Sequence, residues 1–163
     1  MMTVLRTIEF LSLSLWLGAD AFLSFVVAPG AFAVLASRDQ AGTMVGYALW
    51  RMHFAGVVCG LVFLVARVVR SRSVGSLVAP AALCVVLMIA LTVISVHAVS
   101  PRMAELRGKM GSIERATASS QGTENPLLAE FGKLHRVSVM LEGGVLLAGL
   151  AGMWFMVREM GRV

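Results

Sequence analysis

Hydrophobic residues gather in four long stretches that shorter polar segments separate. The stretches cover residues 8–36, 44–69, 77–100 and 134–157. Each is longer than the ~20 helical residues that cross ~30 Å of bilayer hydrocarbon. Runs such as LVFLVA and LCVVLMIAL are apolar at odd and even positions alike, which favours helices over the alternating strands of a membrane barrel. The pattern predicts an all-α, integral membrane four-helix bundle forming a single transmembrane domain over residues 1–163.

The polar connections differ in length. Residues 37–43 and 70–76 form short links, whereas residues 101–133 form a long one. The sequence PRMAELRGKMGSIERA at its start predicts an amphipathic surface helix between the third and fourth spans. The following TASSQGTENP is typical of a loop. In an up-and-down bundle, both termini share one side of the membrane with the short 70–76 link. We call this the terminal side, and the opposite side the loop side.

Composition supports the membrane assignment. Of 163 residues, 58% are hydrophobic and 14% are charged, whereas a soluble domain carries about 25% charged residues. The net charge of +5 comes from basic residues that mostly flank the apolar stretches. There they contact headgroups and set topology, so the expected partner is the lipid bilayer and not nucleic acid. Because the chain has no GxSxG, P-loop or HExxH motif, no enzyme chemistry is indicated.

Ionisable residues within the apolar stretches are the candidate site. Asp20 lies near the middle of the first stretch and Glu142 lies within the fourth. A charged group at the bilayer centre costs ~3 kcal/mol or more, so both carboxylates should face the bundle interior and have partners. The functional interpretation is a polar pocket open toward the loop side, and the alternative is a structural ion pair that fixes helix register. The expected pocket residues are Asp20, Arg51, His53, His135 and Glu142.

Three single histidines lie toward the loop side of their helices: His53, His97 and His135. Two imidazoles at matching depth on facing helices can hold haem, and imidazoles near the surface can hold a metal ion. No HxxxH or ExxH pair occurs on one helix, so the sequence selects no cofactor. A haem- or metal-binding redox protein is therefore one alternative function.

Small residues recur at helical spacing in the second and fourth stretches. They are expected at close helix contacts, because in lipid small side chains allow backbones to approach. The same surfaces are candidates for a homo-oligomer or for a subunit contact in a larger membrane complex, and the intramolecular use is the default. The residues are Gly56, Gly60, Gly144, Ala148 and Gly152.

Several segments resemble the transmembrane protein 205-like family, whose bacterial members are classed as a domain of unknown function. The resemblance rests on WLG (16–18), FVVAPGAFAVL (25–35), Pro101 and FGKLHRVSVML (131–141). It implies a four-span protein of the bacterial inner membrane with a transporter-like or accessory role, because animal relatives are linked to platinum resistance. The family is also distantly similar to CopD-type copper proteins and HemJ-type haem-pathway oxidases. The resemblance carries site roles first to His135 and Ser138, while Glu142 stands where the family tends to have asparagine.

Overall fold

The computed structural model describes residues 2–118 and 125–161, and every regular element in these residues is helical. Four candidate spans, Met2–Val34, Arg38–Ser71, Pro80–Met110 and Pro126–Met160, are long and apolar enough to cross a membrane. The predicted all-α four-helix architecture is confirmed. The elements are α1 (Met2–Phe22), η1 (Leu23–Val27), α2 (Ala28–Val34), α3 (Arg38–Ser71), η2 (Val74–Val78), α4 (Pro80–Ile94), η3 (Ser95–Val99), α5 (Ser100–Met110), α6 (Ile113–Ala118) and α7 (Pro126–Met160).

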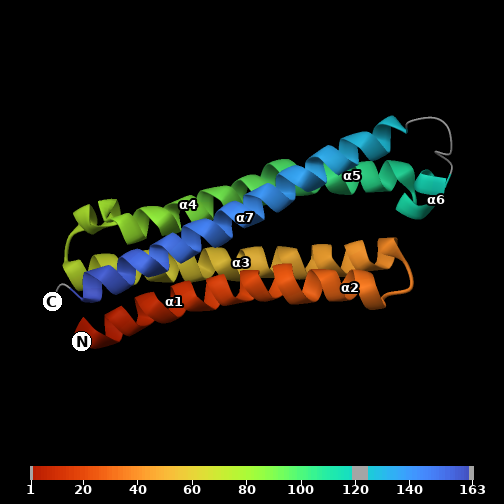
Figure 1. Ribbon diagram of the computed structural model, residues 1–163. Coiled ribbons are helices and arrows are strands. Elements are labelled where there is room, and N and C mark those ends of the chain that lie inside the picture. The colour runs from red at the N-terminus through yellow and green to blue at the C-terminus, as the bar shows by residue number, and fades with distance from the viewer. Residues whose placement is uncertain (1, 119–124, 162–163) are drawn as a thin grey trace.

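The helices form two antiparallel pairs. Helices α1 and α2 pack along α3, and helices α4 and α5 pack along α7 (Figure 1). Contacts of α1 with α7 and of α3 with α4 join the pairs into one bundle. Both chain ends lie at one end of the bundle, and α6 lies at the other. This arrangement matches the up-and-down order expected from the sequence.

Local sequence signals explain where the long helices begin. Helix α3 starts after Ser37, whose side chain accepts a hydrogen bond from the Gln40 amide at 3.1 Å. Helix α7 starts with Pro126 after Asn125, whose side chain accepts from the Leu127 amide at 3.0 Å. Both residues satisfy amide groups that the first helical turn leaves without partners. Both long helices therefore begin directly after a residue whose side chain caps the first turn.

Two π-helical turns interrupt otherwise regular helices, and each ends two residues before a proline. Segment η1 ends at Val27 before Pro29, and segment η3 ends at Val99 before Pro101. Proline lacks an amide donor and its ring crowds the carbonyl four residues earlier. The wider turn accommodates that ring, so the helix continues past the proline. Pro29 thus accounts for a wider helical turn within the first span.

The polar segment after the third apolar stretch is helical, but its arrangement differs from the expected separate surface helix. Helix α5 continues α4 through η3 without a break, and it packs against α7. The chain turns at Gly111, which has a positive φ of 70°, and then forms the short α6. Asp39 accepts hydrogen bonds from the Ser112 hydroxyl at 2.7 Å and from the Ile113 amide at 3.0 Å. These bonds join the start of α6 to the start of α3.

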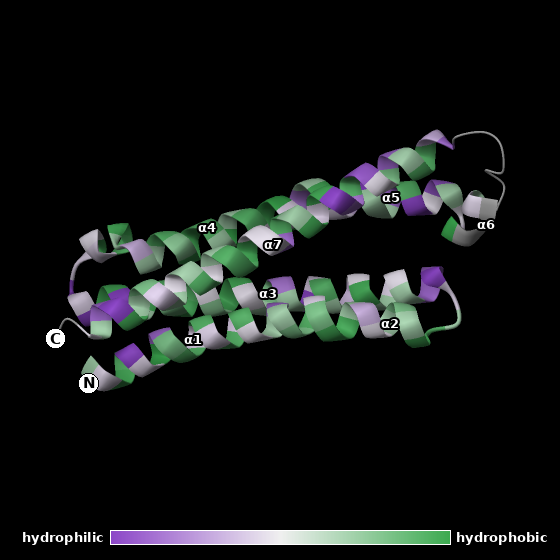
Figure 2. Ribbon diagram, in the orientation of Figure 1, coloured by the Kyte–Doolittle hydropathy of each residue, from purple (hydrophilic) through white to green (hydrophobic). Residues whose placement is uncertain are grey.

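The outer surface of the bundle is apolar. Phe25, Phe54 and Leu147 are 72%, 67% and 69% exposed, respectively. Figure 2 shows hydrophobic residues along the middle of the helices and hydrophilic residues concentrated toward the two ends of the bundle. Such a surface would be unfavourable in water but suits acyl chains. The molecule therefore has the surface of an integral membrane protein.

Close packing at glycines brings α1 against α3. The indole of Trp16 is 2% exposed and fills the space above Gly56 and Gly60. A Cβ atom at Gly56 would overlap this indole, and one at Gly60 would lie 2.7 Å from it. The predicted small-residue positions of α3 thus lie at a contact within the chain.

The glycines of α7 also meet neighbouring helices. A Cβ atom at Gly144 would lie 3.0 Å from the Leu91 side chain, and one at Gly152 would lie 3.2 Å from the Cβ of Cys84. Ala148 is buried beside them. Gly149 was not among the predicted small-residue positions, and it is more crowded, because its Cβ would lie 2.8 Å from the Leu17 side chain.

Candidate functional site

A buried histidine–carboxylate pair joins the two helix pairs near the middle of the bundle. His53 of α3 and Glu142 of α7 lie with Nε2 and Oε1 only 2.6 Å apart. The side chains are 3% and 13% exposed. At this separation one proton lies between the two atoms, on either the nitrogen or the oxygen. The pair is therefore a proton-binding contact between α3 and α7.

Asp20 of α1 adds a second carboxylate to this region. It is fully buried at 0% exposure, and it lies within electrostatic range of both Glu142 and His53. Its Oδ1 accepts a hydrogen bond from the Ser24 hydroxyl at 3.5 Å, which is a long contact. We call Asp20, His53 and Glu142 the central cluster. Three of the four long helices contribute to it.

The central cluster retains unused hydrogen-bonding capacity. Within the described residues, Asp20 Oδ2 and Glu142 Oε2 are buried and have no hydrogen-bond partner. The same holds for the Trp16 indole nitrogen, which lies against the Gly56 position in the turn of α3 after His53. Buried polar atoms are normally paired, and exceptions in a native fold often mark a functional site. These oxygens are available to an exchanging proton or a small ligand.

Two of the expected pocket residues lie away from the central cluster. Arg51 is exposed, and its guanidinium lies 5.3 Å from the ring centroid of Tyr47 and 5.4 Å from that of Trp50. His135 is also exposed, two turns before Glu142 on α7. Ser138 is half-buried on the turn between them. The structure thus brings together Asp20, His53 and Glu142 from the expected set.

The three histidines do not converge. His97 is exposed, and its Nδ1 lies 3.0 Å from the Val93 carbonyl oxygen of its own helix. His135 is exposed as well, whereas His53 is buried against Glu142. Over the described residues, no group of three or more histidine, cysteine, aspartate or glutamate side chains is placed to hold a metal ion. The geometry does not favour a shared metal or haem site on these histidines.

A second polar network lies at the terminal end of the bundle. Glu9 of α1 is almost completely buried, and its Oε1 accepts a hydrogen bond from Arg70 Nε at 2.5 Å. Arg67, 4% exposed, donates through Nη2 to both carboxylate oxygens of Glu159 at 2.8 and 2.7 Å. Its Nε donates to the Ser76 carbonyl oxygen at 3.2 Å. We call Glu9, Arg67, Arg70 and Glu159 the terminal network; it joins α1, α3 and α7 to the turn η2.

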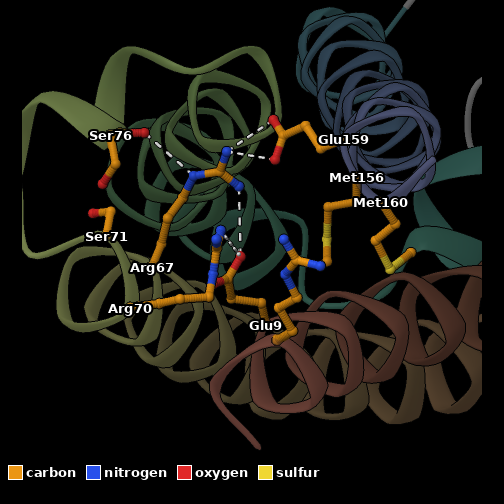
Figure 3. A pocket seen from close by; sticks show the side chains of 9 residues that line it. Glu9, Arg67, Arg70, Ser71, Ser76, Met156, Glu159 and Met160 are labelled. Carbon is orange, nitrogen blue, oxygen red and sulfur yellow. Dashed lines mark hydrogen bonds and ion pairs between the residues drawn. The ribbon is translucent and has the colours of Figure 1, made fainter. Parts of the chain in front are cut away.

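A cavity of about 280 Å³ opens beside the terminal network. The sequence predicts a pocket toward the loop side, whereas this cavity lies at the opposite end of the bundle. Figure 3 shows the paired side chains of Arg67, Glu9 and Glu159 on its wall, with Met156 and Met160 beside them. The full lining is Arg6, Glu9, Arg67, Arg70, Ser71, Ser76, Met156, Glu159 and Met160.

Sequence reasoning did not select the terminal network, because charged residues near span ends ordinarily reach water or headgroups. One signal was available. Glu9 shares a helix face with Trp16 and Asp20, at spacings of seven and eleven residues. Arg67 shares a face with Gly60 and Gly56 at the same spacings. Extending the buried face toward the helix ends would have placed both charges inside the bundle.

Fold and buried polar clusters together define an integral membrane helical bundle with titratable groups in its interior. The chain belongs to the DUF4149 family, described as a domain of unknown function, whose sequence profile matches residues 11–112. No curated protein and no solved structure matches the chain. The matched residues contain Asp20, His53, Arg67 and Arg70, whereas Glu142 lies beyond them.

Proposed function

We propose that the protein is a small transporter-like membrane protein that moves protons across the bilayer through the central cluster. One observation carries this proposal: the buried Asp20 and the largely buried Glu142 share one region with the single imidazole of His53, and Glu142 contacts that imidazole directly. With a neutral imidazole, two ionised carboxylates would put two negative charges in a low-dielectric interior. That arrangement is costly, so at least one proton stays bound in the cluster.

The geometry indicates how the cluster exchanges a proton. The proton between His53 Nε2 and Glu142 Oε1 can reside on either atom, because both are good acceptors at 2.6 Å. The buried oxygens Glu142 Oε2 and Asp20 Oδ2 have no hydrogen-bond partner within the described residues, so each can receive a proton. A proton thus has several acceptor atoms on three helices, which is the arrangement expected of an intramembrane relay.

The backbone next to Asp20 includes a π-helical segment whose rearrangement would alter the central cluster. Segment η1 begins three residues after Asp20, and Ser24 within it donates to that carboxylate. Single π-helical turns in α-helices occur frequently at functional sites. A rearrangement of η1 would change the hydrogen bond to Asp20 and with it the proton occupancy of the cluster.

Proteoliposomes test the proposal directly. The full chain is reconstituted with a pH-sensitive dye inside, and a potassium diffusion potential drives protons inward. We expect proton flux well above that of protein-free liposomes. We further expect Glu142→Gln and Asp20→Asn to reduce the initial flux by at least about tenfold, because each removes an acceptor from the relay.

The matched control is Glu130→Gln, since Glu130 lies on the same helix with its side chain 49% exposed in a surface pair with Arg102. It should keep flux within about twofold of wild type. Wild-type flux equal to that of empty liposomes would overturn the proposal. Equal loss in Glu142→Gln and Glu130→Gln would remove the central cluster from the mechanism.

The family resemblances extend this proposal. The sequence resemblance to the transmembrane protein 205-like family, if it reflects kinship, would imply a transport role in the bacterial inner membrane. A haem- or metal-binding function of the CopD or HemJ type would require histidines that converge on one site. The exposed positions of His97 and His135 do not favour that function. An accessory subunit of a larger membrane complex is the alternative that a lack of flux would favour.

A further inference from the structure

The cavity beside the terminal network carries an excess of positive charge. Three arginines, Arg6, Arg67 and Arg70, face two glutamates, Glu9 and Glu159. The glutamates accept from Arg67 and Arg70, so these four side chains largely compensate one another. Arg6 is half-buried at the cavity wall and has no hydrogen bond or ion pair with any residue that the structure describes. One positive charge therefore faces the cavity without an anion.

Arg67 provides a second unused donor. Its Nη1 is buried and forms no hydrogen bond within the described part of the chain, although it lies 3.5 Å from Glu9 Oε2. A buried guanidinium N–H without an acceptor is costly. An anionic group entering the cavity would offer acceptor oxygens to this donor and to Arg6, which line the same cavity.

We propose that this cavity binds a phosphate group, carried either by the headgroup of an anionic phospholipid or by a free phosphate. Guanidinium groups bind phosphate oxygens through paired, charge-assisted hydrogen bonds. A phosphodiester carries one negative charge, which matches the one unpaired arginine. Basic cavities between helices at the membrane surface are typical binding sites for anionic headgroups.

Size and lining agree with this ligand class. A cavity of about 280 Å³ lies at the lower end of small-molecule sites, so it suits a headgroup more than a large metabolite. Met156 and Met160 form an apolar part of the wall next to the charged part. Flexible methionine side chains can pack against the glycerol and first methylene groups of a lipid. This site is separate from the central cluster, and its test does not depend on proton flux.

Thermal unfolding of the full chain in neutral detergent tests the proposal. Two ligands are titrated: potassium phosphate against potassium chloride at equal ionic strength, and phosphatidylglycerol against phosphatidylcholine. We expect at least one of the two anionic ligands to raise the unfolding midpoint by about 3–5 °C at saturation. Stabilisation by phosphatidylglycerol alone assigns a lipid headgroup, and stabilisation by phosphate alone assigns a soluble ligand. Stabilisation by both assigns the phosphate group itself.

Two substitutions of Arg6 test whether the ligand binds in this cavity. Arg6→Gln should weaken the apparent affinity by about tenfold, because a charge-assisted contact is lost. Its ligand-free midpoint should stay close to wild type, since Arg6 has no described partner. Arg6→Lys, which keeps the charge, should have an intermediate affinity.

The matched control is Arg158→Gln, because Arg158 is exposed and stacks on Trp154 at 4.6 Å outside the cavity lining. It should keep its affinity within about twofold. The proposal is overturned if neither anion stabilises the wild type, or if Arg6→Gln and Arg158→Gln respond alike.

Discussion

The two polar clusters both place ionisable groups inside the bundle but balance their charge differently. In the terminal network, two glutamates meet two arginines, and both carboxylates receive hydrogen bonds. In the central cluster, two carboxylates share one imidazole, and Asp20 Oδ2 and Glu142 Oε2 have no hydrogen bond within the described residues. A compensated network stabilises one arrangement of helices, whereas an uncompensated one changes with its proton occupancy. This difference supports the proposal that the first is mainly structural and the second functional.

The largest effect should follow from removing the arginine that lies between two glutamates. Arg67→Met deletes the hydrogen bonds to Glu159 and Ser76 and leaves Glu9 with Arg70 alone. Because a buried ionic network then lacks a central partner, we expect a loss of about 3–5 kcal/mol in the free energy of unfolding. Denaturant unfolding in mixed micelles measures it.

Arg158→Met is the control for that measurement, since Arg158 is exposed at the same end. It should change the free energy of unfolding by less than about 0.5 kcal/mol. Equal losses in the two variants would show that the terminal network does not hold the helices together.

Replacing a glutamate by glutamine should change the free energy of unfolding more in the terminal network than in the central cluster. Glu9→Gln leaves Arg67 and Arg70 with one fewer anion and should cost about 2–3 kcal/mol. Glu142→Gln keeps a hydrogen-bonding group next to His53 and removes one of two like charges. Its stability should therefore stay within about 1 kcal/mol of wild type. A Glu142→Gln protein as unstable as Glu9→Gln would contradict the division into a structural and a functional region.

The sequence predicted most of the fold, because length and uniform apolarity are sufficient to identify membrane helices. It also predicted that Asp20 and Glu142 would face the bundle interior, since lipid excludes unpaired charge, and it named His53 as one of their candidate partners. Arg51 and His135 were grouped with them by depth alone, and depth does not determine which way a side chain faces around the helix. The structure places both on the exposed surface.

The terminal network shows a different limit of sequence reasoning. Arg67 and Glu159 lie near helix ends, where a long side chain reaches either headgroups or a neighbouring helix. Which of these occurs depends on the tertiary arrangement. The pairing of Arg67 with Glu159 joins residues 92 positions apart, and no local pattern specifies such a partner. The prolines at 29 and 101 mark where the helices widen, but the sequence alone does not show that each helix continues past its proline through a π-helical turn.

The stability of the central region should depend on close helix packing, whereas that of the terminal region depends on ion pairs. Gly56→Ala places a methyl group where the indole of Trp16 lies, in the turn of α3 after His53. The indole is buried between α1 and α3, so the added methyl group would crowd this helix contact. We expect a loss of about 1–3 kcal/mol in the free energy of unfolding.

Gly46→Ala is the matched control for the packing prediction, because Gly46 is on the same helix with no atom within 4 Å of its added Cβ. Alanine is the better helix former, so this variant should be unchanged or more stable by up to about 1 kcal/mol. The two glycines should thus respond with opposite sign. If Gly56→Ala also reduces proton flux while Gly46→Ala does not, the contact of Trp16 with α3 positions Asp20 beside His53. If both variants unfold like wild type, close packing at Gly56 does not hold α1 in place.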